Sequence, residues 1–468
     1  MSDTGTSGSG TGGGGGSGSG GSGRSRGRAP RPPGFLLVSA CYQAFTLSDG
    51  ALRMLVLLHL HAEGQTAWAL ALVLLPYELA GVATNLLGGY LGARFGLKHT
   101  LTLGLGMQAV ACALLTVETS GLTLGYVMAT QVLSGVAKDL AKTSAKSYVR
   151  LLASPAPRGG GAGASSSGGG GQSLRLFGLV AWLTGSKNAM KGLGFFVGGI
   201  LLTSVGFAHT NAALAALLAA TCVAAFWRLP KQAASARRGS FRQLLAHDRA
   251  TNWLSAARLF LFGSRDAWFA IALPLFLVDQ GWSPATVGAY LSLWIIGYGF
   301  VQACAPNLLN GGRGKASRAE AAPDVGSDQR CGAAATARYT GFLLAPLGLT
   351  AAAVHWLPEH AVVAALLVGL AAYGAVFAIT SSLHSWLIVA LHDDDSHRHI
   401  AERVGFYYAA NALGRLVGVA ASGWLYASFV RPREGLTACL MASIAAVVLA
   451  TACSGRMRFI AASSGGAR

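Results

Sequence analysis

The sequence has 468 residues, of which 52% are hydrophobic and only 12% are charged, about half the charged fraction of an average soluble domain. A soluble chain of this length would divide into several apolar-cored domains, and no polar break of that kind is present. Its 36 lysines and arginines against 18 acids give a formal charge of +18. A chain this apolar has too little water-facing surface for a nucleic-acid-binding protein, so the composition predicts a membrane protein.

Cysteine usage excludes two further classes of protein. The seven cysteines are scattered and odd in number, and no two of them form a CxxC pair. A disulfide framework or a structural zinc site needs regular, paired spacing. We therefore expect no metal and no cofactor.

In chain order, residues 1–34 are rich in Gly, Ser and Arg and predict a disordered tail. From Phe35 onward, apolar stretches recur at about the 20 residues that a membrane-spanning helix needs. The predicted helices are 35–60, 68–92, 100–118, 121–148, 174–206, 211–229, 251–278, 285–308, 338–356, 360–391, 403–429 and 436–454.

The connections divide these twelve helices into two sets of six. A basic linker at 230–250 separates an N-terminal half, 35–229, from a C-terminal half, 251–455. Gly-rich segments at 155–173 and 310–336 predict flexible inserts, and residues 456–468 form a second tail. Eighteen cations lie on the even-to-odd connections, whereas the opposite connections carry only Arg431 and Arg433. The positive-inside rule then places both termini in the cytoplasm.

The two halves also resemble each other. Residues 188–193 (NAMKGL) in the fifth helix match residues 411–416 (NALGRL) in the eleventh, and a small-residue pair follows each run. Two six-helix repeats joined by a long middle loop are the layout of major facilitator transporters. The predicted fold class is therefore an all-α polytopic membrane protein with the major facilitator fold.

Charged side chains inside the predicted helices are the main candidates for function, because each is costly in the bilayer unless paired or facing water. Nine are cations: Arg53, Lys138, Lys142, Lys146, Lys187, Lys191, Arg258, Arg265 and Arg415. Four are acids: Asp49, Glu78, Asp139 and Asp266. The excess of cations predicts a cavity for a multiply charged anion, since arginine clamps oxyanions and lysine acts as a point charge.

Helical spacing suggests how these groups are used. Asp49 and Arg53 are four residues apart and could pair, as could Asp139 and Lys142 at three residues. Lys187 and Lys191 place two like charges on one face of a helix that has no acid. We expect Lys187, Lys191, Arg258, Arg265 and Arg415, with Asn188 and Asn411, to bind the substrate. Coupling or gating is assigned to Asp49, Arg53, Glu78, Lys138, Asp139 and Asp266. Of these, Asp49 and Asp266 would pair with nearby arginines, or carry protons if export is proton-coupled.

Three other motifs carry less information. Residues 392–399 (HDDDSHRH) resemble a metal-binding tract but fall in a predicted cytoplasmic loop, where a solvated charge run is the simpler interpretation. His384 lies among serines and could line the pore or relay protons. Gly89, Arg94, Gly96 and Lys98 resemble the major facilitator gating loop between helices two and three. Ala93 replaces the acid usual in that loop.

Several long, charged runs resemble the organoarsenical efflux permeases of the ArsJ type. These runs are 42–53, 131–140, 183–192, 254–266 and 294–302, and the resemblance covers essentially 35–455. It implies export of 1-arseno-3-phosphoglycerate, an ester that glyceraldehyde-3-phosphate dehydrogenase makes when arsenate replaces phosphate. That dehydrogenase would then be a functional partner, and the protein would confer arsenate resistance.

The residues and the resemblance agree on the substrate's chemistry. Phosphate and pentavalent arsenate groups suit lysines and arginines, whereas trivalent arsenic would favour clustered thiolates. The prediction is a non-enzymatic secondary transporter, in the plasma membrane or an organelle membrane, that exports an anionic organoarsenical. Two alternatives stay open: a transporter of another organophosphate or organic anion, and a membrane-embedded transferase that uses His384 and Asp393–Asp395.

Overall fold

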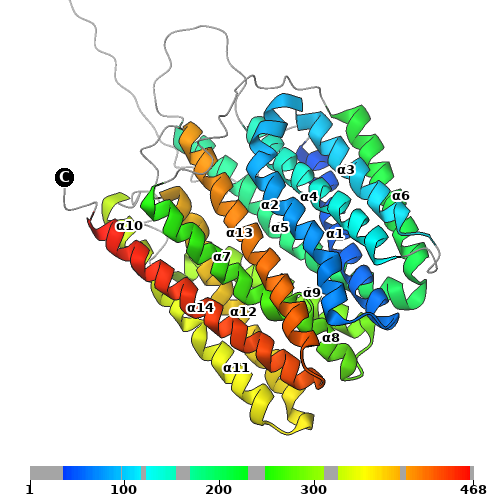
Figure 1. Ribbon diagram of the computed structural model, residues 1–468. Helices are drawn as coiled ribbons and strands as arrows, with labels where there is room; N and C mark the ends of the chain where they lie inside the picture. Colours follow the sequence, from blue (N-terminus) through cyan, green and yellow to red (C-terminus); the bar gives the residue numbers. More distant parts are fainter. Residues whose placement is uncertain are drawn as a thin grey trace, which may run out of the picture.

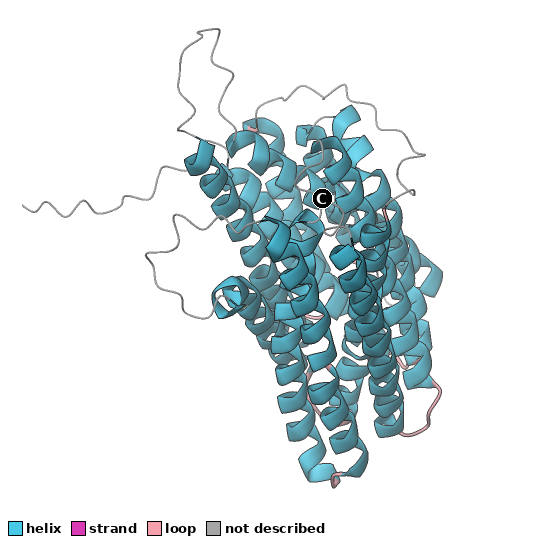
Figure 2. Ribbon diagram, turned by 90° about the vertical axis from the view of Figure 1, so that its left-hand side faces the viewer, coloured by secondary structure: helices cyan, strands magenta, loops and turns pink. Residues whose placement is uncertain are grey.

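The computed structural model describes residues 35–95, 97–117, 123–153, 169–229, 248–309, 325–390 and 397–463. Every regular element in these ranges is an α-helix (Figures 1 and 2). In the first half the helices are α1 (Phe35–Ala62), α2 (Ala67–Phe95), α3 (Leu97–Leu114), α4 (Leu124–Ala153), α5 (Gly169–Ser204) and α6 (Phe207–Arg228). In the second half they are α7 (Arg249–Phe269), α8 (Ala272–Asp279), α9 (Pro284–Leu309), α10 (Val325–Phe342), α11 (Leu344–Trp356), α12 (Glu359–Ala390), α13 (His397–Ala427) and α14 (Pro432–Ser463).

Two pairs of these helices are single membrane passes interrupted by a proline. Pro274 lies in the first turn of α8 and Pro346 in the first turn of α11. A proline lacks the amide hydrogen and clashes with the carbonyl four residues earlier. Each helix break lies three to four residues before its proline. The hydroxyl of Ser422 accepts from the freed backbone N–H of Ala272 at 3.1 Å. Counting α7–α8 and α10–α11 as one pass each, the described helices form the twelve predicted passes.

Helix boundaries differ from the sequence prediction mainly in the Gly-rich inserts. Residues 325–336 were predicted to be flexible, but α10 begins at Val325. Similarly, α5 begins at Gly169, inside the predicted insert 155–173, and α14 runs to Ser463, into the predicted tail. Alanine has the highest helix propensity of any residue, which explains the extension of α10 and α14 through their alanines. The glycines at the start of α5 have no such explanation. The tail 1–34, the linker 230–247 and residues 310–324 lie outside the described residues.

The helices of the two halves lie side by side and meet along two seams (Figure 1). At one seam α5 packs against α9, and at the other α2 packs against α13. Glycine makes the first seam close: a Cβ added at Gly199 would lie 2.4 Å from the carbonyl oxygen of Pro284, and one at Gly288 would lie 2.6 Å from that of Phe195. Backbones can approach this closely only where side chains are absent.

Several surfaces of this bundle suit a lipid environment. Seven segments of the described chain are long and apolar enough to cross a membrane, by length and composition. The helices that carry Asp49, Lys138, Lys191 and Arg415 are not among them, since their polar side chains lower the mean hydropathy. Large apolar side chains such as Leu349, Val368 and Phe300 are exposed. Exposed Trp227 and Trp356 lie at helix ends, as in the aromatic belts of membrane proteins.

Arg433, one of the two cations on the side predicted to be poor in positive charge, caps a helix. Its guanidinium donates to the backbone carbonyls of Val354 at 2.5 Å, His355 at 2.9 Å and Leu357 at 2.5 Å. These groups lie at the C-terminus of α11, where the helix dipole favours a cation and the last carbonyls have no helical partner. A structural role therefore explains this exception to the charge asymmetry.

We expect Arg433→Gln to destabilise the protein by about 1–3 kcal/mol, because several carbonyls lose a charged donor. Thermal unfolding of the purified protein measures this as a lower melting temperature. Arg431→Gln is the matched control: the Arg431 side chain is 80% exposed and pairs with the exposed Glu434 at 3.5 Å, so we expect a change below about 0.5 kcal/mol. Equal melting temperatures for the two variants would contradict the capping role.

Candidate functional site

Glu78 of α2 lies at the centre of the charged groups in the bundle. It is 1% exposed, and its Oε1 accepts from Arg53 of α1 at 2.9 Å and from Arg415 of α13 at 2.5 Å. Lys138 of α4 places its Nζ 4.0 Å from Oε2. Pro76, two residues before Glu78, leaves the helix without one backbone hydrogen bond at this level. Three helices thus direct cations at one buried carboxylate.

A second buried carboxylate, Asp266 of α7, shares one of these cations. Arg265 donates to Asp266 Oδ1 from Nε at 2.7 Å and from Nη2 at 2.6 Å. Arg415 donates from Nε to Asp266 Oδ2 at 3.0 Å. Arg415 therefore bridges a carboxylate of the first half, Glu78, and one of the second half. We call Arg53, Glu78, Lys138, Arg265, Asp266 and Arg415 the central ion cluster; it holds four cations and two acids.

A smaller polar group lies further along α2 and α4. Lys142 donates to Asp139 at 3.1 Å and to the Asn85 side chain at 3.0 Å. Thr84 donates to the other oxygen of Asp139 at 2.9 Å. The predicted pairing of Asp139 with Lys142 is confirmed. This group is internally neutral, which favours a structural or gating role for Asp139.

The predicted pairing of Asp49 with Arg53 is wrong. The Tyr77 hydroxyl donates to Asp49, and Arg53 instead bonds to Glu78. The spacing of Asp49 and Arg53 along α1 allowed them to pair. In the structure, however, the neighbouring residues Tyr77 and Glu78 of α2 face α1, and Tyr77 bonds to Asp49 while Glu78 bonds to Arg53. The same tyrosine ring lies 3.7 Å from the Lys138 ammonium, a distance typical of a cation–π contact.

Lys191 of α5 is a partly buried cation with little compensation from the described residues. Among the described residues it forms no hydrogen bond or ion pair, and its nearest aromatic ring, that of Phe195, lies 5.7 Å from Nζ. Arg53, Arg415 and Lys187 are its cationic neighbours, and Asp49 is its acidic neighbour. A partly buried ammonium among other cations is costly unless an anion joins it.

Asn188, on the same helix, links the two halves. Its side-chain amide donates to Gln302 of α9 at 3.2 Å. A Cβ at Gly299 would lie 3.0 Å from the Cβ of Asn188, so the helices are close at this level. Lys187 and Asn188 are partly buried, and both lie in the part of α5 that packs against α9.

Arg258 and Asn411, predicted to bind substrate, bond to each other within the second half. Arg258 is 5% exposed and donates to Asn411 Oδ1 at 3.1 Å and to the carbonyl and hydroxyl of Ser381, each at 3.1 Å. Its guanidinium lies 4.1 Å from the Phe262 ring. These contacts favour a structural role for both residues. His384 is fully buried nearby, and within the described residues neither ring nitrogen has a hydrogen-bond partner.

Aromatic rings lie beside the central ion cluster. Four rings from three helices form a chain: Phe195 of α5, Phe269 of α7, and Trp294 and Tyr298 of α9. In this order, the centres of successive rings are 6.4, 4.9 and 5.9 Å apart. Arg265 lies 5.6 Å from the ring of Phe377 of α12. We call these five rings the aromatic wall. The site therefore combines cations with apolar, polarisable surfaces, an arrangement that suits an organic anion.

The remaining predicted motifs are separate from this site. Lys98 is 8% exposed and its Nζ lies 5.3 Å from the Phe226 ring. The side chains of Gly89, Arg94 and Gly96, of Lys146 and of the 392–399 tract lie outside the described residues. In the part of the chain that is described, no three His, Cys, Asp or Glu side chains are grouped to hold a metal.

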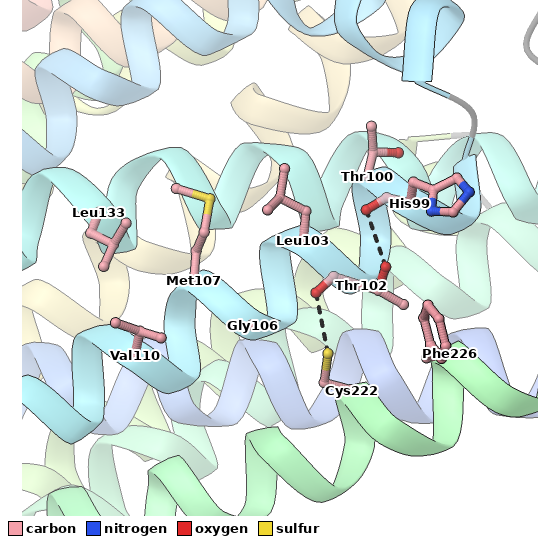
Figure 3. A pocket seen from close by; sticks show the side chains of 10 residues that line it. All are labelled: His99, Thr100, Thr102, Leu103, Gly106, Met107, Val110, Leu133, Cys222 and Phe226. Atoms are coloured by element: carbon pink, nitrogen blue, oxygen red, sulfur yellow. Dashed lines mark hydrogen bonds between the residues drawn. The ribbon is translucent and has the colours of Figure 1, made fainter.

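An open groove of about 630 Å³ lies elsewhere, between α3, α4 and α6 (Figure 3). His99, Thr100, Thr102, Leu103, Gly106, Met107, Val110, Leu133, Cys222 and Phe226 line it. Cys222 donates to the Thr102 carbonyl at 3.3 Å across it. Leu103, Val110 and Phe226 are about half exposed, as lipid-facing side chains are, and the groove contains none of the central ion cluster. We do not assign substrate to it.

Three polar partners in the site were absent from the sequence prediction: Tyr77, Thr84 and Gln302. Their hydroxyl and amide groups carry no charge, whereas the predicted site was based on charged residues within the membrane helices. Glu78 was predicted to act in coupling or gating, but its central position was not predicted, although it is the single acid of the 29-residue helix α2. A lone acid beside a helix-interior proline was the available signal.

Comparison with known proteins supports the fold. No protein-family model and no curated protein matches the chain. Among solved structures 257 chains are similar. One of these, described as "Structural insights into substrate recognition in proton dependent oligopeptide transporters", has a TM-score of 0.61 and 14% sequence identity, and the match covers 91% of this chain and 97% of that chain. At that identity the likeness shows the fold alone. The chain has the fold of the major facilitator transporters, as predicted.

Proposed function

We propose that the protein is a secondary transporter that exports an anionic organoarsenical, 1-arseno-3-phosphoglycerate, across the plasma membrane with both termini in the cytoplasm. The observation that carries this proposal is Lys191, which interacts electrostatically with three cations, Arg53, Arg415 and Lys187, and with one acid, Asp49, and forms no ion pair among the described residues. An anion entering between these side chains would supply the missing negative charge.

The exposure of the cluster supports this role. Arg53, Arg265 and Arg415 keep 12%, 14% and 16% of their side-chain surface exposed, whereas Glu78 keeps 1% and Asp266 keeps 3%. The three arginines are therefore more exposed than the two acids with which they pair. Arginine forks fit the oxygens of phosphate and arsenate groups. Our candidates for contact with the substrate are Arg53, Lys187, Asn188, Lys191, Arg265 and Arg415.

The chemistry of the surroundings favours pentavalent arsenic in an ester. Among the described residues the sulfurs form no group that could bind trivalent arsenic through several thiolates. The aromatic wall, formed by Phe195, Phe269, Trp294, Tyr298 and Phe377, provides apolar surface for a carbon skeleton. That surface also favours a second candidate, export or uptake of another organic phosphate, which shares the electrostatics.

Arsenate resistance in a sensitive host tests the proposal. We expect the protein to raise the tolerated arsenate concentration only when a glyceraldehyde-3-phosphate dehydrogenase is co-expressed, because the ester must be made before it is exported. Protection of equal size without the dehydrogenase would contradict the ester as substrate. Protection absent in both strains, from protein that reaches the membrane, would favour the second candidate.

A further inference from the structure

Arg415 connects the two halves of the protein through separate nitrogen atoms. Its Nε binds Asp266 on α7, in the same half, at 3.0 Å, and its Nη2 binds Glu78 on α2, in the other half, at 2.5 Å. The two carboxylates are not equally held. Asp266 also has two bonds from the adjacent Arg265, so it would keep Arg415 in place if Glu78 left.

Glu78 is held through one oxygen only. Both arginines donate to Oε1, while Oε2 is buried without a hydrogen-bond partner among the described residues. The group nearest to Oε2 is the Lys138 ammonium at 4.0 Å. An unsatisfied buried carboxylate oxygen is costly, so this half of Glu78 is suited to accept a proton.

The charged groups around Glu78 come from every neighbouring helix. Arg53 on α1, Lys138 on α4 and Arg415 on α13 face it directly, and Asp266 on α7 faces it across Arg415. On α2 itself the neighbour is Tyr77, which donates to Asp49 of α1. Removal of the two arginines would leave Glu78 with Lys138 as its one remaining cationic partner.

We propose that Glu78 is a resident anion that the substrate displaces from Arg53 and Arg415, and that Glu78 takes up one proton as it is displaced. This inference rests on the proposed function. Arg53 Nη1 and Arg415 Nη2 donate to the same oxygen of Glu78, so an oxyanion that binds these two N–H groups takes the place of Glu78. A buried carboxylate that has lost two arginines is stabilised by protonation. The proton comes from a solvent hydronium ion, whose O–H bond breaks as one O–H bond forms on Glu78, and the ion pairs exchange.

This exchange makes binding of the anion and of the proton cooperative, because each favours the other by the same factor. The anion and one proton would then cross together. A substrate with two or more negative charges still carries net negative charge with that proton, so the membrane potential favours its exit from the cell. The displacement of Glu78 also breaks the Arg415–Glu78 bond between the two halves. Substrate binding is thereby coupled to the relative movement of the halves.

Titration calorimetry on the full-length protein in nanodiscs tests the inference, with 3-phosphoglycerate as the probe. Measurements between pH 7.5 and 8.5 keep the phosphate dianionic, since its second pKa is near 6. Repeating each titration in buffers of different ionisation enthalpy counts the protons taken up. We expect about one proton per anion bound and a Kd that weakens about tenfold per pH unit.

Glu78→Gln keeps the size of the side chain and removes its charge. We expect it to bind the probe without proton uptake, with a Kd independent of pH. Glu359→Gln, at an exposed carboxylate on α12, is the matched control and should behave as the parent protein does.

Three results would overturn the inference. Binding to the parent protein without proton uptake would show that Lys138 compensates the displaced carboxylate, and would leave the proposed function intact. Proton uptake that persists in Glu78→Gln would place the proton on another group. Failure of the probe to bind the parent protein and Glu78→Gln alike would contradict an organic-anion site, and with it the proposed function.

Discussion

Replacing Arg415 by methionine is expected to destabilise the protein by about 3–5 kcal/mol, the usual cost of removing one partner from a buried ion pair. Arg415 bonds to both Glu78 and Asp266, and each is almost fully buried. The variant would leave Glu78 with Arg53 and the distant Lys138, and Asp266 with Arg265 alone. Thermal unfolding in detergent measures the effect as a markedly lower melting temperature.

A triple variant separates charge from packing. In Arg415→Met with Glu78→Gln and Asp266→Asn, the buried acids are neutral, so we expect most of the lost stability to return. If Arg415→Met alone had the same melting temperature as the parent protein, the two carboxylates could not depend on Arg415 for charge compensation. The central ion cluster would then have no structural role.

Replacing both Lys187 and Lys191 by glutamine is expected to abolish export while the protein still folds. Lys191 has no ion-pair partner among the described residues, so its removal leaves no acid uncompensated. One charged contact to an oxyanion contributes about 1.5–3 kcal/mol, and loss of two should weaken substrate binding by more than a hundredfold. Arsenate resistance and the melting temperature measure the two parts of this prediction.

Lys191→Arg is the matched control, since it keeps the charge at the same position. We expect it to retain part of the export that Lys191→Gln loses. Full resistance in the double glutamine variant, at normal expression, would remove Lys187 and Lys191 from the substrate site.

The helix count and the fold class followed from the sequence because they depend on local features. Apolar length and loop charge predicted twelve passes, and the fold confirms them. The two proline breaks, at Pro274 and Pro346, do not change the number of passes. Boundaries near the Gly-rich inserts were wrong, as α10 shows, because composition alone does not separate a flexible Ala/Gly segment from a helix extension.

Helical spacing predicted one of two pairs within a helix correctly, and it could not predict pairs between helices. Asp139 and Lys142 are three residues apart and bond as expected. Glu78 and Arg415 are 337 positions apart, and their contact depends on how α2 packs against α13. In the same way, the packing of α2 against α1 pairs Arg53 with Glu78 and Asp49 with Tyr77, although helical spacing favoured an Asp49–Arg53 pair. The cation excess was therefore visible in the sequence, whereas its partial compensation was not.

Accumulation of arsenic in inside-out membrane vesicles tests the central claim most directly. The vesicles would receive arsenate, glyceraldehyde 3-phosphate, NAD⁺ and purified glyceraldehyde-3-phosphate dehydrogenase on the outside, and elemental analysis would measure arsenic inside. We predict accumulation only with the complete mixture and the parent protein, and none with the Lys187→Gln, Lys191→Gln variant. Equal accumulation from arsenate alone, or none from the complete mixture, would contradict export of the organoarsenical ester.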